Sequence, residues 1–94
     1  MSWALKEEVT FDSRLVTSKD WASYPILTFP EIPEIDVLIL NRPEEPAKGI
    51  GEPVTTPVAA ALANAIYDAT GARVRNLPMR PERILESLKE ASTI

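Results

Sequence analysis

The placement of proline constrains the fold of this chain more than any other feature. Seven of the nine prolines fall at positions 25, 30, 33, 43, 46, 53 and 57, and two of the three glycines, Gly49 and Gly51, fall in the same region. Each proline removes a backbone N–H donor and fixes φ, so a regular helix cannot run through these residues. The sequence therefore predicts extended segments and ordered loop across the middle of the chain.

Length and composition exclude several classes of protein. The 94 residues allow one domain, residues 1–94, and a hydrophobic content of 45% is enough for a core. The net charge of −4 comes with scattered basic residues, which argues against nucleic acid as a partner. No apolar stretch approaches the ~20 residues of a membrane span, so no membrane partner is expected. The chain has neither Cys nor His, which removes zinc fingers, iron–sulfur ligation, Cys nucleophiles and Ser-His-Asp chemistry. Any acid–base catalysis by this chain would have to use a carboxylate, Lys or Tyr.

Two segments have the residue pattern of β-strands. A β-hairpin is predicted over about residues 8–17, with a short turn at Asp12 and Ser13 between two runs rich in β-branched and aromatic residues. A strand is predicted over about residues 35–40, where Ile-Asp-Val-Leu-Ile-Leu is bounded by prolines. The expected fold class is therefore α+β, with a small antiparallel or mixed sheet.

Two helices are predicted to follow and to pack on this sheet. The first, about residues 57–70, has Thr56 as its expected N-cap, Pro57 at its first position and Gly71 as a left-handed C-terminal cap. The second, about residues 81–91, begins at Pro81 with Glu82 in its first turn. Its charged residues are expected to form a solvated face.

The loop between the predicted strand and the first of these helices is the candidate functional site. About fifteen residues, Arg42 to Thr56, have no helix or strand pattern, and loops of this length are usually functional or disordered. Within the loop, Gly49-Ile50-Gly51 precedes the carboxylate of Glu52, and glycines let a backbone approach a ligand closely. Taken alone, this motif is also compatible with a tight turn that carries a solvated glutamate.

The loop motif is one of several that agree in order and spacing with a known family. They lie between Trp3 and about Leu88, at residues 4–12, 24–27, 33–35, 49–53, 57–71 and 77–78. Together they resemble the C-terminal end of the molybdenum-binding large (beta) subunit of the molybdenum hydroxylases, the xanthine dehydrogenase and aldehyde oxidase family. The branch that the chain looks like is the bacterial isoquinoline 1-oxidoreductase and aldehyde dehydrogenase type.

The resemblance implies a role for each residue of the loop motif. Glu52 would be the general base beside the molybdenum, in a reaction that hydroxylates an aldehyde or N-heteroaromatic carbon with oxygen from water. Gly49, Ile50 and Gly51 would lie against the molybdopterin cofactor, in its cytosine dinucleotide form, and no residue of this chain would ligate the metal. Burial would suit such a base, because it raises the pKa of a glutamate above its ordinary value of about 4.3.

Family subunits are many times longer than this chain, so the resemblance implies partners. The rest of the large subunit would supply most of the cofactor cradle, and a separate small subunit would carry the 2Fe–2S clusters. The isolated chain is expected to be inactive, to hold no cofactor, and to form a homo-oligomer or aggregate through uncovered apolar surface. The alternative is a catalytically inactive stand-alone remnant or interaction module. The expected location is the cytoplasm, or the periplasm if the full-length subunit is exported.

Overall fold

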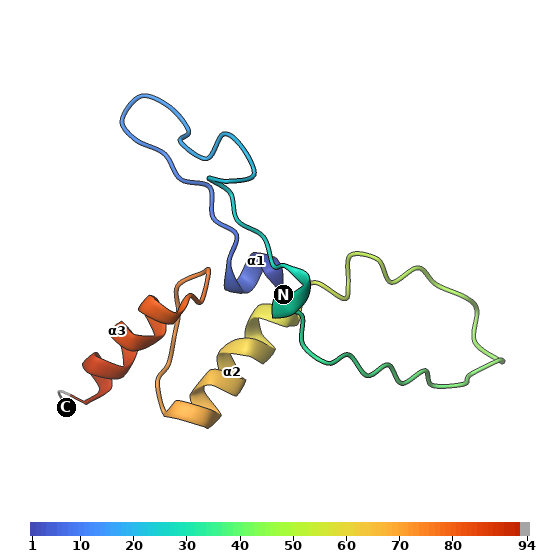
Figure 1. Ribbon diagram of the computed structural model, residues 1–94. Coiled ribbons are helices and arrows are strands. Elements are labelled where there is room, and N and C mark those ends of the chain that lie inside the picture. Colours follow the sequence, from blue (N-terminus) through green and yellow to red (C-terminus); the bar gives the residue numbers. More distant parts are fainter. Residues whose placement is uncertain (93–94) are drawn as a thin grey trace.

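The computed structural model describes residues 1–92 and contains three α-helices and one short 3₁₀ helix. In chain order these are α1 (Ser2–Leu5), the 3₁₀ helix η1 (Phe29–Glu31), α2 (Val58–Thr70) and α3 (Pro81–Ala91). Figure 1 shows the helices gathered in one part of the molecule, while the chain between α1 and η1 and the chain between η1 and α2 leave it as two wide loops. The molecule is therefore a small helical body with two long extensions.

Helix α2 ends as its sequence predicts but begins one residue later. Gly71 adopts the left-handed conformation with φ 75°, and its N–H donates to the carbonyl of Tyr67 over 2.7 Å. The prediction of Thr56 as N-cap is wrong: Pro57 occupies that position and no side chain caps the helix. The residues before α2 form turns, in which the Thr55 N–H donates to the Glu52 carbonyl and the Val58 N–H donates to the Thr55 carbonyl. An N-cap residue normally has an extended backbone, which these turns do not provide at Thr56.

Helix α3 has the bounds that the sequence predicts. Pro81 is its first residue, Glu82 lies in its first turn, and the preceding Arg80 is extended, with φ −71° and ψ 156°. Ile84 and Leu88 are half-buried on its inner side. No helix within residues 1–92 combines the length and apolar character that crossing a bilayer requires.

The predicted α+β fold is wrong, because no sheet forms among the described residues. The hairpin over about 8–17 is reduced to one antiparallel bridge, Phe11 to Val16, although Asp12 makes the expected turn by accepting the N–H groups of Arg14 and Leu15. An isolated pair of strands is marginally stable in water unless a third strand or a helix covers its apolar face. Here nothing covers it, and Phe11 is 76% exposed.

The strand predicted over about 35–40 is likewise absent. These residues are extended but pair with no other part of the described chain, and the apolar side chains among them are 72–86% exposed. The segment has the residue types of a β-strand, but a strand also needs a neighbouring strand to supply its hydrogen bonds. The two helices consequently do not pack on a sheet.

The core is small and lies where α1, α2 and the segment before α3 meet. Its buried residues are Ala4, Val74 and Met79, with half-buried side chains of α2 and Ile84 packed around them. The Met79 N–H donates to the Ala4 carbonyl over 2.7 Å, which joins the beginning of the chain to its last third. The radius of gyration is 17.3 Å, against about 12 Å for a compact chain of this length.

Candidate functional site

The Gly-Ile-Gly-Glu motif, residues 49–52, lies near the end of the long loop that joins η1 to α2, residues 32–57. Every residue from Thr28 to Pro57 is exposed, and Glu52 is among them. Directly after Glu52 the chain turns, and its carbonyl accepts both the N–H of Thr55 over 2.9 Å and the Thr55 hydroxyl over 2.8 Å. Glu52 is six residues before the first residue of α2, and the turn between them connects the motif to this helix.

Both ends of the loop are held close to α1. At the first end, the Lys6 ammonium contacts the Glu31 carboxylate over 2.6 Å, and this interaction fixes η1. The same carboxylate accepts the Thr28 N–H and the Thr28 hydroxyl, each over 2.8 Å. These contacts, the Lys6 hydrogen bond first among them, lower the pKa of Glu31 to about 2.

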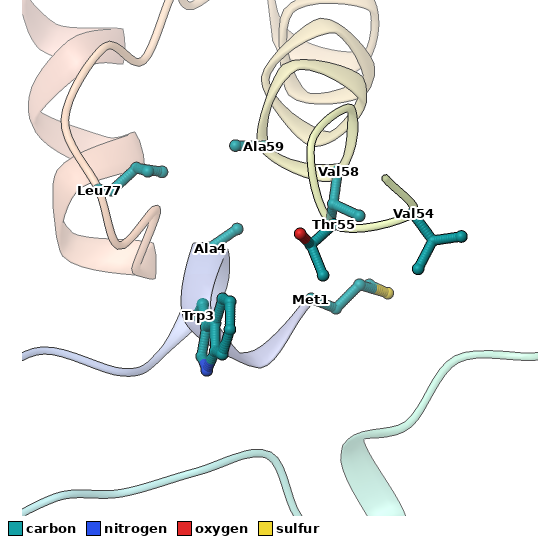
Figure 2. A pocket seen from close by; sticks show the side chains of 8 residues that line it. All are labelled: Met1, Trp3, Ala4, Val54, Thr55, Val58, Ala59 and Leu77. Atoms are coloured by element: carbon teal, nitrogen blue, oxygen red, sulfur yellow. The ribbon is translucent and has the colours of Figure 1, made fainter. Parts of the chain in front are cut away.

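At the second end, a pocket of about 450 Å³ separates α1 from the beginning of α2. Figure 2 shows Met1, Thr55 and Val58 grouped on one side, with Leu77 on the other and Ala4 between them. The lining is almost entirely apolar; its residues are Met1, Trp3, Ala4, Val54, Thr55, Val58, Ala59 and Leu77. The pocket begins two residues after Glu52, which makes it part of the surroundings of the motif.

The fold of the chain itself does not require glycine at positions 49 and 51. Neither residue has a positive φ, and a Cβ added at Gly49 or Gly51 would meet no atom within 4 Å. Gly71, in contrast, has a positive φ that an L-residue adopts only with strain. Any need for glycine in the motif must therefore come from something outside the described chain.

The motif has groups that could contact a cofactor through its backbone. Among residues 1–92, the N–H groups of residues 49 to 52 donate to no protein atom, and the carboxylate of Glu52 has no partner. The described residues hold no cluster of three or more carboxylates that could bind a metal ion. This chain can therefore offer unpaired N–H groups and one free carboxylate to a group that other residues hold.

Two arginines whose role the sequence did not indicate organise the helical body beside the site. The side chain of Arg83 donates to Glu8 Oε1 over 2.7 Å and to the carbonyl of Pro78 over 3.0 Å. Arg80 donates to the carbonyl of Lys6 over 2.9 Å. The prediction that the charges of α3 form only a solvated face is thus wrong for Arg83, and no local pattern could have found a partner 75 positions away.

Asn64, a polar residue of α2 whose partner the sequence did not reveal, binds the chain itself. Its Oδ1 accepts a hydrogen bond from Arg73 over 2.9 Å, and the same guanidinium lies 4.0 Å from the centre of the Tyr67 ring. Asn64 is therefore not a free ligand group in this structure.

Comparison with known proteins gives consistent relatives. No protein-family model matches the chain. It is 55% identical over 87 residues to a nicotinate dehydrogenase subunit of Pseudomonas putida, a match that covers 93% of this chain and 7% of the relative. It is 37% identical over 97 residues to the aldehyde oxidoreductase molybdenum-binding subunit PaoC of Escherichia coli, covering 96% of this chain and 13% of the relative.

A third relative, the xanthine dehydrogenase molybdenum-binding subunit of Escherichia coli O157:H7, is 34% identical over 100 residues. That match covers all of this chain and 13% of the relative. The chain thus spans between about a fourteenth and an eighth of the length of these proteins. Two of these three relatives are named as molybdenum-binding subunits, and the resemblance read from the sequence motifs is confirmed. The chain belongs to the molybdenum hydroxylase family, as the counterpart of a short segment of the molybdenum-binding subunit.

Proposed function

We propose that this chain is the C-terminal part of a molybdopterin-binding domain and supplies the active-site loop of a molybdenum hydroxylase. Glu52 acts as the general base, and Gly49, Ile50 and Gly51 lie against the cofactor. The observation that carries the proposal is the match of nearly the whole chain to the molybdenum-binding subunits of xanthine dehydrogenase and aldehyde oxidoreductase. The unpaired N–H groups and the free carboxylate of the motif support it.

When bound, the molybdenum cofactor supplies the two-electron oxidation by which an aldehyde or N-heteroaromatic carbon is hydroxylated. Adding the oxygen of water to such a carbon releases two protons for every two electrons removed, so the site needs a group that accepts a proton. The Glu52 carboxylate can accept it at either oxygen, because neither is engaged within the described chain. The turn held by Thr55 fixes the backbone of Glu52, which limits the positions that its side chain can take.

The remainder of the site belongs to other polypeptide. The proposed partners are the rest of the molybdenum-binding subunit and a small subunit with 2Fe–2S clusters. The proposed cofactor is molybdenum-molybdopterin in its cytosine dinucleotide form. Glu52 is exposed in this chain, and the burial that would suit a base has to come from these partners.

Replacing Glu52 in the assembled enzyme tests the proposal. Glu52→Gln removes the proton acceptor and keeps the size of the side chain, so turnover should fall by at least about 100-fold. Molybdenum content, measured by elemental mass spectrometry, should stay unchanged. Glu45→Gln, in the same exposed loop, is the matched control and should keep full turnover. Wild-type turnover in Glu52→Gln would show that the assigned role is wrong.

Purification of the tagged chain from its source cells distinguishes the proposal from an inactive remnant or interaction module. Near-stoichiometric molybdenum together with larger co-purifying polypeptides is the expected result. A chain recovered with neither metal nor partner would instead favour the remnant.

A further inference from the structure

Residues 35–40 expose more neighbouring large apolar side chains to water than any other segment of residues 1–92. Five of the six are large aliphatic residues, and each is between 72% and 86% exposed. None of their backbone N–H or carbonyl groups is hydrogen-bonded to the described chain. An extended apolar segment with both backbone edges unpaired readily pairs with a strand of another polypeptide.

The order of the side chains indicates that both faces of this segment become covered. Alternation along an extended chain puts Ile35, Val37 and Ile39 on one face and Leu38 and Leu40, after Asp36, on the other. A strand with one face in water alternates apolar with polar residues, whereas apolar residues on both faces are typical of a strand inside a covered sheet. Edge strands are usually protected by charge, and this segment carries only Asp36.

The surface that the chain exposes in excess of a compact protein of its mass is as large as a permanent interface. The chain exposes 8223 Å², whereas a compact protein of 10.4 kDa would expose about 5,400 Å². The excess of about 2,800 Å² is more than three times the roughly 800 Å² that one partner buries in a standard interface. The curated relatives are many times longer than this chain and so contain the additional polypeptide that could cover this surface.

We propose that residues 35–40 insert as a strand, paired along both edges, into a sheet of the polypeptide that completes the molybdenum-binding subunit. The inference rests on the proposed function for the identity of its partner. It differs from a sheet within this chain, which the structure excludes for the described residues. The segment lies in the same loop as Glu52, so its insertion would also hold the motif against the partner.

Amide hydrogen exchange tests the inference. The probe is the nicotinate dehydrogenase subunit of Pseudomonas putida from which the 87 matching residues are deleted, co-expressed with this chain. Successive N–H groups of a strand point to opposite edges, so pairing along both edges protects odd-numbered and even-numbered residues alike. In the purified complex, amide exchange at both sets of residues within 35–40 should slow by at least 100-fold relative to the free chain. A complex in which these amides exchange as fast as in the free chain overturns the inference and leaves the proposed function standing.

The remaining outcomes are equally decisive. Slow exchange at 35–40 in the free chain at high concentration would make a second copy the occupant and overturn the inference. Failure to form any complex would count against both the proposed function and the inference.

Two substitutions at one position separate backbone pairing from side-chain burial. Val37→Pro removes an N–H that has no partner in the free chain, so the helical body should be unaffected, but recovery of the complex should fall at least tenfold. Val37→Ala keeps the N–H and should reduce recovery less than Val37→Pro does. Equal recovery for the proline and alanine variants would overturn pairing through the backbone.

Discussion

Arg83 in α3 and Glu8 after α1 form a salt bridge with 2.7 Å between Nη2 and Oε1. Arg80 adds a second, longer contact to the same carboxylate, 3.4 Å from its Nη1 to Oε2. Arg83 also donates to the carbonyls of Leu77 and Pro78. One guanidinium thus joins the chain after α1, the segment before α3 and α3 itself.

This salt bridge should make the helical body sensitive to acid. The hydrogen bond from Arg83, aided by the charges of both arginines, lowers the pKa of Glu8 in the folded chain. A carboxyl group with a lowered pKa contributes stability above its ordinary pKa and loses that contribution as the pH falls through the lowered value. In Arg83→Gln, we expect the pKa of Glu8 to rise toward 4.5, as followed by carbon NMR of its carboxyl group. An unchanged titration would show that the salt bridge does not persist in solution.

The Glu31 carboxylate should titrate with an unusually low midpoint. Its pKa is lowered to about 2 by the hydrogen bond from Lys6 and by those from Thr28. The contribution of these contacts to stability is therefore complete above about pH 4.5 and is lost as the pH falls toward 2. Lys6→Met should raise the NMR midpoint of Glu31, while Lys6→Arg, which keeps the charge, should leave it low. Similar midpoints in the two variants would contradict the assignment to Lys6.

The C-terminal end of α2 should depend on Gly71. Alanine there would have to adopt a φ of 75°, which costs about 1 kcal/mol or slightly more for an L-residue. We expect Gly71→Ala to lower the helical signal at 222 nm in circular dichroism, because the last turn of α2 frays. Gly51→Ala is the control and should leave the signal unchanged, since its φ is not positive and its Cβ meets no atom. A loss of signal in both variants would contradict this account.

The isolated chain should associate with itself. Its buried core consists of a few small or medium side chains, while Phe11, Trp21 and Phe29, all outside residues 35–40, are 76–90% exposed. Large exposed apolar patches favour association. Sedimentation velocity should show a dimer or larger species whose share grows with concentration. A strict monomer at high concentration would contradict the prediction.

The sequence predicted α2 and α3 well because their signals are local, but it did not predict the short helices α1 and η1. Pro81 and Gly71 mark a helix start and a helix end through their own backbone conformations, whatever surrounds them. The prediction of a sheet was wrong for the opposite reason. Residues 35–40 have the side chains typical of a β-strand, but no strand within residues 1–92 pairs with them. The motif at Glu52 and its place in a long loop before α2 were both predicted, but the exposure of every residue of that loop was not. Contacts such as Glu8 with Arg83 join distant positions and leave no local trace.

The short link between residues 35–40 and Glu52 has a kinetic consequence. Glu52 follows Leu40 by twelve residues, and a chain of that length spans at most about 40 Å. Once residues 35–40 are bound, the glutamate can search only that volume, where short flexible links give effective concentrations in the millimolar range. Delivery of the carboxylate would then become an intramolecular step that no longer depends on how much of this chain is present in solution.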